Sequence, residues 1–402
     1  MAKAINYTSK QWTEEEESLL FSMRQDGLTY SMISSSLLRS IEACEKKYRS
    51  TIWTTKPVYN PVTGKINERF KKAHLEKLSG LQDKKHQNKK MMADIIGDKI
   101  AQAVEALPKA PKIIYSKTNK PKTTNTPEDV GLMLSDTHIG QDISLEETGG
   151  LSEYNMSIFK KRVNTLKMAT ADIVELHSHL YKLPNMHIFC LGDIVAGMND
   201  VGAWNPTYIN MSIYDQFAEG SEALADMINY WLGLFENIKF YGVAGNHGRA
   251  ANKGTEKEYV NWDFMVYNFL KARFANNDRV EFIIPKTWWI LQEIRNHKFL
   301  IVHGDDMKSG ASPAKSLMDY ESKMIGILKQ VPDYTLAGHY HSASEMSTNH
   351  GRIFLNGSFI GGDIYSLKSL QKTSRPEQKI FGIHDRRGVT WSYNLDLSID
   401  RE

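Results

Sequence analysis

The chain has 402 residues, 41% hydrophobic and 24% charged, which is ordinary for a soluble globular protein and long enough for two or three domains. The net charge is +3, and no apolar run approaches the roughly 18 residues of a membrane span, so we expect a soluble cytoplasmic protein without a membrane partner. With only Cys44 and Cys190 as cysteines, a disulfide framework and a thiolate zinc cluster are excluded.

The N-terminal segment, residues 1–53, has the pattern of a small module of three short helices. Thr13 and Glu16 form a T-x-x-E capping box at the start of the first helix. Gly27 ends this helix, a short apolar segment forms the second, and Ser40 caps the third. Seven basic and seven acidic residues cancel in this segment. Three short helices with a glycine at the first turn fit a helix-turn-helix plan.

This segment resembles the Myb/SANT and related homeodomain-like modules. The resemblance is carried by Trp12, Glu15, Leu19, Gly27, Ile33, Leu38, Arg39, Ser40, Ala43 and Tyr48. It implies that the third helix enters the major groove of DNA and presents Lys46, Lys47 and Arg49. Glu42 and Glu45 lie on the same helix and oppose that function. SANT-type relatives bind protein instead, so a protein partner remains the alternative.

Residues 54–127 are predicted to form a basic helical connector that ends in a proline-rich linker. Residues 54–125 contain sixteen Lys and Arg against six Asp and Glu, a net charge of +10, which leaves −7 for residues 126–402. This segregation indicates a basic arm for a polyanion, with DNA as the expected partner, and an acidic body that could hold cations. The alternative is a basic linker that is simply solvated.

Residues 128–402 alternate between short apolar runs and helix-like segments, a pattern typical of an α/β fold. Five of the runs end in polar residues that can bind metals: "VGLMLSD", "MHIFCLGD", "IKFYGVAGNH", "KFLIVHGDD" and "YTLAGHYH". Because α/β sheets place their sites at the carboxyl ends of buried strands, we expect these polar residues to lie at one site.

The polar residues at the strand ends offer carboxylate, amide and imidazole donors and no thiolate. They are Asp136, His138, Asp193, Asn246, His247, His303, His339 and His341. This set suits Mn²⁺ first, or Fe or Zn²⁺, in an open site. Asp193 lies in the middle of the series and could bridge two ions. Two ions roughly 3.5–4 Å apart can generate a hydroxide and neutralise a phosphoryl group during in-line displacement.

The motifs D-x-H, G-D, G-N-H, H-G and G-H-x-H occur in the order found in the calcineurin-like metallophosphoesterases, and the chain resembles that family over residues 130–365. The resemblance implies a two-sheet α/β sandwich flanked by helices. One metal would be held by Asp136, His138, Asp193 and His341, and the other by Asp193, Asn246, His303 and His339. His247 would assist at the phosphoryl oxygens, which makes His247 and Asp193 the expected catalytic residues. Gly192, Gly245 and Gly338 would let the backbone turn beside the ions.

Two features depart from the family pattern. Gly248 and Arg249 follow the G-N-H motif where many relatives have an acidic residue, so Arg249 is a candidate for binding substrate phosphate or else a surface residue. The insert between the second and third motifs contains Trp204, Tyr208 and Tyr214, which could stack on bases or pack into a core of their own.

Taken with the basic connector, these features predict a metal-dependent phosphodiesterase that cleaves DNA by attack of a metal-bridging hydroxide. The alternative is a phosphatase for phosphoproteins or small phosphoesters, whose N-terminal module recruits a protein. The basic connector favours DNA, because the fold alone does not determine the substrate. The sequence leaves the oligomeric state open, with a homo-oligomer among the alternatives.

Overall fold

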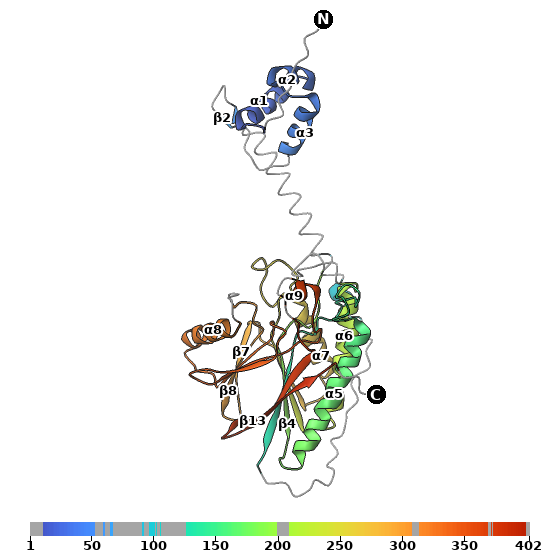
Figure 1. Ribbon diagram of the computed structural model, residues 1–402, viewed down its shortest axis with the longest axis vertical. Coiled ribbons are helices and arrows are strands. Elements are labelled where there is room, and N and C mark those ends of the chain that lie inside the picture. Colours follow the sequence, from blue (N-terminus) through green and yellow to red (C-terminus); the bar gives the residue numbers. More distant parts are fainter. Residues whose placement is uncertain are drawn as a thin grey trace. The chain divides into compact units, whose positions relative to one another are not determined.

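The computed structural model describes residues 11–52, 59–60, 65–66, 91, 96–100, 102, 105, 126–198, 209–307, 313–368, 371 and 373–398. The chain divides into two compact units, Met1–Asp98 and Lys99–Glu402 (Figure 1). Most of the expected connector at 54–127, together with Trp204 and Tyr208, lies outside the described residues. Among the residues that are described, no helix has both the length and the apolar character needed to cross a bilayer.

The N-terminal unit contains the three predicted helices, α1 (Glu14–Gln25), α2 (Tyr30–Leu37) and α3 (Ile41–Ile52). The capping box is formed as expected, since the Glu16 N–H donates to Thr13 Oγ1 at 3.2 Å and the Thr13 N–H donates to Glu16 Oε2 at 2.9 Å. Gly27 follows α1 with a φ of +83°. A two-stranded antiparallel pair, β1 (Tyr59–Asn60) and β2 (Lys65–Ile66), was not predicted from the sequence.

The larger unit is built on two sheets. The six-stranded sheet has the order β13-β12-β3-β4-β5-β6, with β3 (Glu128–Leu134), β4 (Asn185–Cys190), β5 (Asn237–Gly242), β6 (Val280–Ile283), β12 (Glu377–His384) and β13 (Gly388–Asp396). The five-stranded sheet has the order β10-β11-β9-β8-β7, with β7 (Trp289–Ile294), β8 (His297–Val302), β9 (Tyr334–Ala337), β10 (Ser344–Ser347) and β11 (Arg352–Leu355). Strands β3 to β6 run parallel, as do β8, β9 and β11, so the strands predicted to end in metal donors point the same way within each sheet.

The main core lies between the two sheets. Phe189 of β4 stacks on Phe299 of β8 with ring centroids 5.7 Å apart, and both are fully buried. Side chains alternate along a strand, so Phe299 and Ile301 face this core while Leu300 and Val302 face the opposite side. This explains why β8 is apolar at successive positions: both of its faces are buried.

Helices cover the outer faces of both sheets (Figure 1). They are α5 (Met156–Ser178), α6 (Ile213–Trp231) and α7 (Trp262–Arg273) on the six-stranded sheet, α8 (Pro313–Leu328) on the five-stranded sheet, and the short α9 (Ile364–Lys368). Tyr267 of α7 packs on Phe240 of β5. Leu317 of α8 packs with Leu300 and Val302 of β8 in a second hydrophobic cluster, the cluster beneath β8. The prediction of a two-sheet α/β sandwich flanked by helices, preceded by a three-helix module, is confirmed.

Candidate metal centre

The five predicted strand ends meet at one edge of the sandwich. Asp136 and His138 follow β3, Asp193 follows β4, Asn246 and His247 follow β5, His303 follows β8, and His339 and His341 follow β9. Backbone hydrogen bonds tie these loops together: the Asp136 N–H donates to the Gly192 carbonyl at 3.1 Å, and the Gly338 N–H donates to the His303 carbonyl at 2.9 Å. Segments far apart in sequence therefore present their polar side chains to one another.

The backbone of this edge is held in an uncommon conformation. Asp136, His138, Asp193, His339 and His341 have φ values of 52°, 44°, 52°, 68° and 54°. Left-handed backbone outside glycine is uncommon and costs about 1 kcal/mol or more per residue, and it clusters at functional sites. The fold therefore maintains strain at the residues that the motifs single out.

Three glycines allow the loops to approach closely. Gly192 has a φ of +90°, and a Cβ there would lie 2.4 Å from the Gly245 nitrogen. A Cβ on Gly245 would lie 2.1 Å from Asp193 Oδ1, and one on Gly338 would lie 2.7 Å from Asp136 Oδ2. A larger residue at Gly192 would push the two loops apart, and one at Gly245 or Gly338 would displace the carboxylate of Asp193 or Asp136.

The donor atoms converge in three overlapping groups, within each of which all donor atoms lie within 4.8 Å of one another. The groups are Asp136, His138 and His341; His138, Asp193 and His247; and Asp193, His303 and His339. His138 and Asp193 each belong to two groups. Asp193 is therefore a buried carboxylate that two of the donor groups share.

Individual contacts show that the donor set fits divalent metal ions. The Nε2 atoms of His138 and His341 lie 3.1 Å apart, and Asp136 Oδ1 is 3.3 Å from His341 Nε2. His303 Nε2 lies 3.1 Å from both Asp193 Oδ2 and Asn246 Oδ1. Among the described atoms, His138 Nδ1 is buried without a hydrogen-bond partner. Imidazole nitrogens and carboxylate oxygens directed at the same points suit Mn²⁺, Fe or Zn²⁺.

A hydrogen bond to the backbone fixes the orientation of the His303 ring. Its Nδ1 lies 2.7 Å from the Leu191 carbonyl oxygen, so Nδ1–H donates to that carbonyl and Nε2 faces the other donors. Such a hydrogen bond selects the tautomer and holds the ring in the orientation that a metal ligand needs.

Burial and the local charges set the protonation of the site. Burial lowers the pKa of His138 well below its ordinary value, and the neighbouring His247 lowers it further. Burial also lowers the pKa of His339 to about 4, assisted by His303. Burial opposes the charged forms of His303 and Asp193, but their mutual attraction outweighs it, so the pKa of His303 is raised and that of Asp193 is held well below its usual range.

Asp263, near the start of α7, is a structural element of the site that the sequence analysis missed. Its fully buried carboxylate accepts backbone N–H groups from Asp193 at 2.9 Å, Ile194 at 3.0 Å, Val195 at 3.2 Å and Gly245 at 2.9 Å. It therefore connects the loop that carries Asp193 to the loop that carries Asn246 and His247. The sequence signal, Asn261 two residues before Asp263, resembles ordinary helix capping and gave no indication of this role.

His247 lies beside the donor groups but is more exposed than most of them. Its ring is perpendicular to that of His138, with the ring centroids 4.4 Å apart. The backbone N–H of His247 donates to Asp193 Oδ1 at 2.7 Å. Since it is partly exposed, it can contact a molecule that approaches the centre from solvent. The same geometry also places its ring among the donors, as one of the three groups includes it.

The remaining predicted substrate-binding residues are largely engaged in ion pairs. Arg249 pairs with Asp305, which also accepts Lys253 at 3.1 Å. Lys46, Lys47 and Arg49 lie on α3 in the other compact unit, where Lys47 pairs with Glu17, Arg49 pairs with Glu45, and Lys46 is exposed. Tyr214, from the aromatic insert, is partly buried on α6.

Comparisons with known proteins give structural similarity alone. No family model and no curated protein matches the chain. Solved structures that are similar include Vps29 from Cryptosporidium parvum, with 12% identity over 67% of this chain and 98% of that one and a TM-score of 0.30. Vps29 from Entamoeba histolytica in complex with zinc has 11% identity over 67% and 99%, with a TM-score of 0.28. An archaeal phosphodiesterase has 14% identity over 66% and 99%, with a TM-score of 0.30. At these scores the similarity carries no argument about activity, which rests on the site itself.

Proposed function

We propose that the chain is a metal-dependent phosphoesterase that cleaves phosphodiester bonds in DNA. The observation that carries the proposal is the position of Asp193. This carboxylate is 1% exposed and belongs to one donor group with His138 and His247 and to another with His303 and His339. A buried carboxylate shared between two adjacent groups of nitrogen and oxygen donors has little use in an ordinary core, where it would be costly to bury.

The candidate ligands would hold two divalent ions. By the resemblance of the motifs, Asp136, His138, Asp193 and His341 would hold one divalent ion, and Asp193, Asn246, His303 and His339 would hold the other. Mn²⁺ is the first metal to test, and Fe and Zn²⁺ are compatible with the donors. Such ions, when bound, lower the pKa of water to about 7 and polarise phosphoryl oxygens.

His247 would act on the substrate directly. Its partly exposed ring reaches the space in front of the buried donors, where a phosphoryl group would lie. From there its ring N–H would hydrogen-bond to a phosphoryl oxygen and supply a proton to the departing oxygen. The hydrogen bond from the His247 backbone N–H to Asp193 Oδ1 holds His247 beside the donor groups.

The assignment of DNA as the substrate is supported by charge rather than by the site. Residues 54–125 have a net charge of +10, which is suited to a polyanion. The second candidate, a phosphatase whose N-terminal module recruits a protein, is favoured by a different observation. Two of the three cations expected to read DNA on α3 are already paired, Lys47 with Glu17 and Arg49 with Glu45.

One experiment separates the two candidates. The full chain with Mn²⁺ is incubated with plasmid DNA, with linear DNA and with p-nitrophenyl phosphate, alongside Asp193→Asn to exclude a contaminating nuclease. We expect cleavage of DNA by the wild type and none by the variant. Hydrolysis of the monoester without any DNA cleavage would favour the phosphatase, and no hydrolysis of either substrate would contradict the proposed activity.

A further inference from the structure

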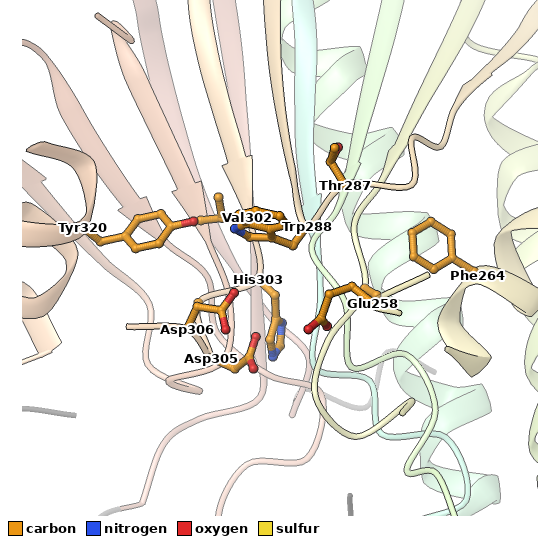
Figure 2. A pocket seen from close by; sticks show the side chains of 11 residues that line it. Glu258, Phe264, Thr287, Trp288, Val302, His303, Asp305, Asp306 and Tyr320 are labelled. Carbon is orange, nitrogen blue, oxygen red and sulfur yellow. The ribbon is translucent and has the colours of Figure 1, made fainter. Parts of the chain in front are cut away.

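A recess lies beside the candidate metal centre, since His303 belongs to both. It is lined by Ala244, Glu258, Phe264, Thr287, Trp288, Val302, His303, Gly304, Asp305, Asp306 and Tyr320. Figure 2 shows the His303 side chain at its base, so a molecule in the recess would lie next to the centre.

One wall of the recess is aromatic and accessible. Trp288 is 44% exposed although it lies directly before strand β7, where its neighbour Trp289 is packed against the cluster beneath β8. Figure 2 shows the Trp288 indole above His303, with the Tyr320 ring beyond it. An exposed indole at the edge of a recess offers a flat apolar surface on which a planar group can stack.

The recess also contains a carboxylate that has no partner among the described residues. Asp305 is paired with Arg249 and Lys253, and Asp306 is paired with Lys253. Glu258, in contrast, makes no hydrogen bond or ion pair with any other described residue. Figure 2 shows its side chain directed into the recess on the side of His303. No described residue occupies its oxygens, which can accept hydrogen bonds from a ligand.

These features select the kind of group that fits. A phosphate would be repelled by the carboxylate of Glu258, so it belongs at the metal donors and not in the recess. A nucleobase has a flat face for Trp288 and N–H donors on its edge for Glu258.

Lysines lie on the segments that flank the recess. The Nζ atoms of Lys286 and Lys257 are 4.8 Å and 5.7 Å from the centre of the Tyr259 ring. Both lysines are exposed, and Tyr259 and Lys286 adjoin the recess residues Glu258 and Thr287 in the chain. Lysines over an aromatic ring combine a phosphate contact with a stacking surface, as single-stranded nucleic acid requires.

We infer that this recess binds the base of the nucleotide whose phosphate lies at the metal donors, with Trp288 stacking on the base and Glu258 accepting its N–H groups. This inference rests on the proposed function and specifies its substrate as an unpaired nucleotide. A base held in a duplex could not place its face on Trp288, so the substrate strand enters as a single strand or an unpaired end.

The test compares two diesters with the same p-nitrophenolate leaving group, thymidine 5′-(p-nitrophenyl phosphate) and methyl p-nitrophenyl phosphate. In Trp288→Ala we expect the ratio of kcat/KM for the nucleotide over the methyl diester to fall about 10-fold, the size of one lost base–aromatic stack. The lower ratio should come from a higher KM for the nucleotide diester, and Trp288→Phe should restore most of the ratio. Tyr230→Ala is the matched control, because Tyr230 is 39% exposed and has the Lys167 Nζ 5.5 Å from its ring, and it should leave both rates unchanged.

Other outcomes would overturn the inference. An equal loss on both diesters in Trp288→Ala would give Trp288 a structural role only. A wild-type preference for p-nitrophenylphosphorylcholine over the thymidine diester would mean that the recess takes a cation. If the wild type hydrolyses no diester, the proposed function fails, and base binding is then tested by tryptophan fluorescence. Quenching by thymidine 5′-monophosphate that is present in the wild type and lost in Trp288→Phe would support base binding. No quenching in the wild type would refute base binding.

Discussion

The carboxylate of Asp263 holds the backbone of Asp193, with the Asp193 N–H donating to Asp263 Oδ2 at 2.9 Å. The same oxygen accepts the Gly245 N–H at 2.9 Å, and Asn261 Nδ2 donates to the Gly245 carbonyl at 2.8 Å. The start of α7 therefore fixes the distance between two of the loops that carry candidate metal donors. Asp263 contacts none of the donor side chains in these bonds, so its influence on a metal would act through the backbone.

Asp263→Asn should weaken metal binding while the protein stays folded. The amide has one acceptor atom in place of two, so it cannot accept all four N–H groups that the carboxylate now accepts. We expect metal affinity to fall about 10- to 100-fold, as found when groups that orient metal ligands are removed. Calorimetric titration with Mn²⁺ measures this directly.

Asp215→Asn is the control for that change. Asp215 also lies in the first turn of a helix, α6, but it is exposed and hydrogen-bonds to Ser212. Its substitution should leave metal affinity unchanged. Equal metal affinity in Asp263→Asn and the wild type would show that the loops hold their spacing without this carboxylate.

His247→Asn separates chemistry from metal binding. The buried donors remain in place, so both metals should stay bound, whereas turnover should fall by roughly 10²- to 10⁴-fold, the contribution of a positioned acid–base group. Bound metal and cleavage rate are measured on the same preparation. A loss of metal together with activity would make His247 a ligand, in agreement with its place in the second donor group.

Metal binding should release protons near neutral pH. The pKa of His303 is raised to about 10 in the metal-free chain, where burial is outweighed by Asp193, so this ring is protonated at pH 7. A histidine must be neutral to bind a metal, so binding displaces that proton, and metal affinity should fall as the pH is lowered. His341, whose pKa is raised because Asp136 outweighs burial, would add to this release, whereas His138 and His339 have lowered pKa values and should contribute no proton.

Calorimetry in buffers with different ionisation enthalpies counts the released protons. The account expects the apparent binding enthalpy to change with the buffer at pH 7. If the enthalpy is the same in all buffers, His303 is either neutral before binding or not a ligand.

Much of this site was predictable because its donors follow apolar strands. A run such as "KFLIVHGDD" identifies both the buried strand and the residue at its end, and parallel strands bring such ends to one edge. The role of Asp263 was not predictable, since it depends on backbone N–H groups that exist at that place only in the folded chain. Pairing of Arg249 with Asp305 likewise required the contact of two loops, so the sequence left Arg249 as a free cation.

Stability should depend on a buried network at Asp129. This carboxylate accepts hydrogen bonds from Arg295 Nη2 at 2.8 Å and Asn185 Nδ2 at 3.0 Å and lies 3.2 Å from His187 Nε2. Burial would raise its pKa, but His187 and Arg295 outweigh burial and lower it. Its contribution is therefore present above the pKa of the unfolded chain and is lost as the pH falls through the lowered folded value.

Asp129→Asn should reduce the free energy of unfolding at pH 7 by about 3 kcal/mol, the cost of breaking one side of a buried ion pair. Urea unfolding measures it, and the difference from the wild type should shrink in acid. Asp385→Asn removes the other partner of Arg295, at 2.8 Å, but its side chain is 45% exposed, so that change should cost less than about 1 kcal/mol. A difference for Asp129→Asn that persists unchanged in acid would contradict the lowered pKa.

The central claim is that Asp193 joins two adjacent cation sites, and the metal content of Asp193→Asn tests it most directly. Full chains of the wild type and the variant are loaded with Mn²⁺, freed of excess metal and analysed for bound metal per chain, with circular dichroism to verify the fold. We expect the wild type to retain metal at both donor groups, and the folded variant to lose metal at both together and to show almost no turnover. An Asp193→Asn protein with full metal content and wild-type activity would contradict the account.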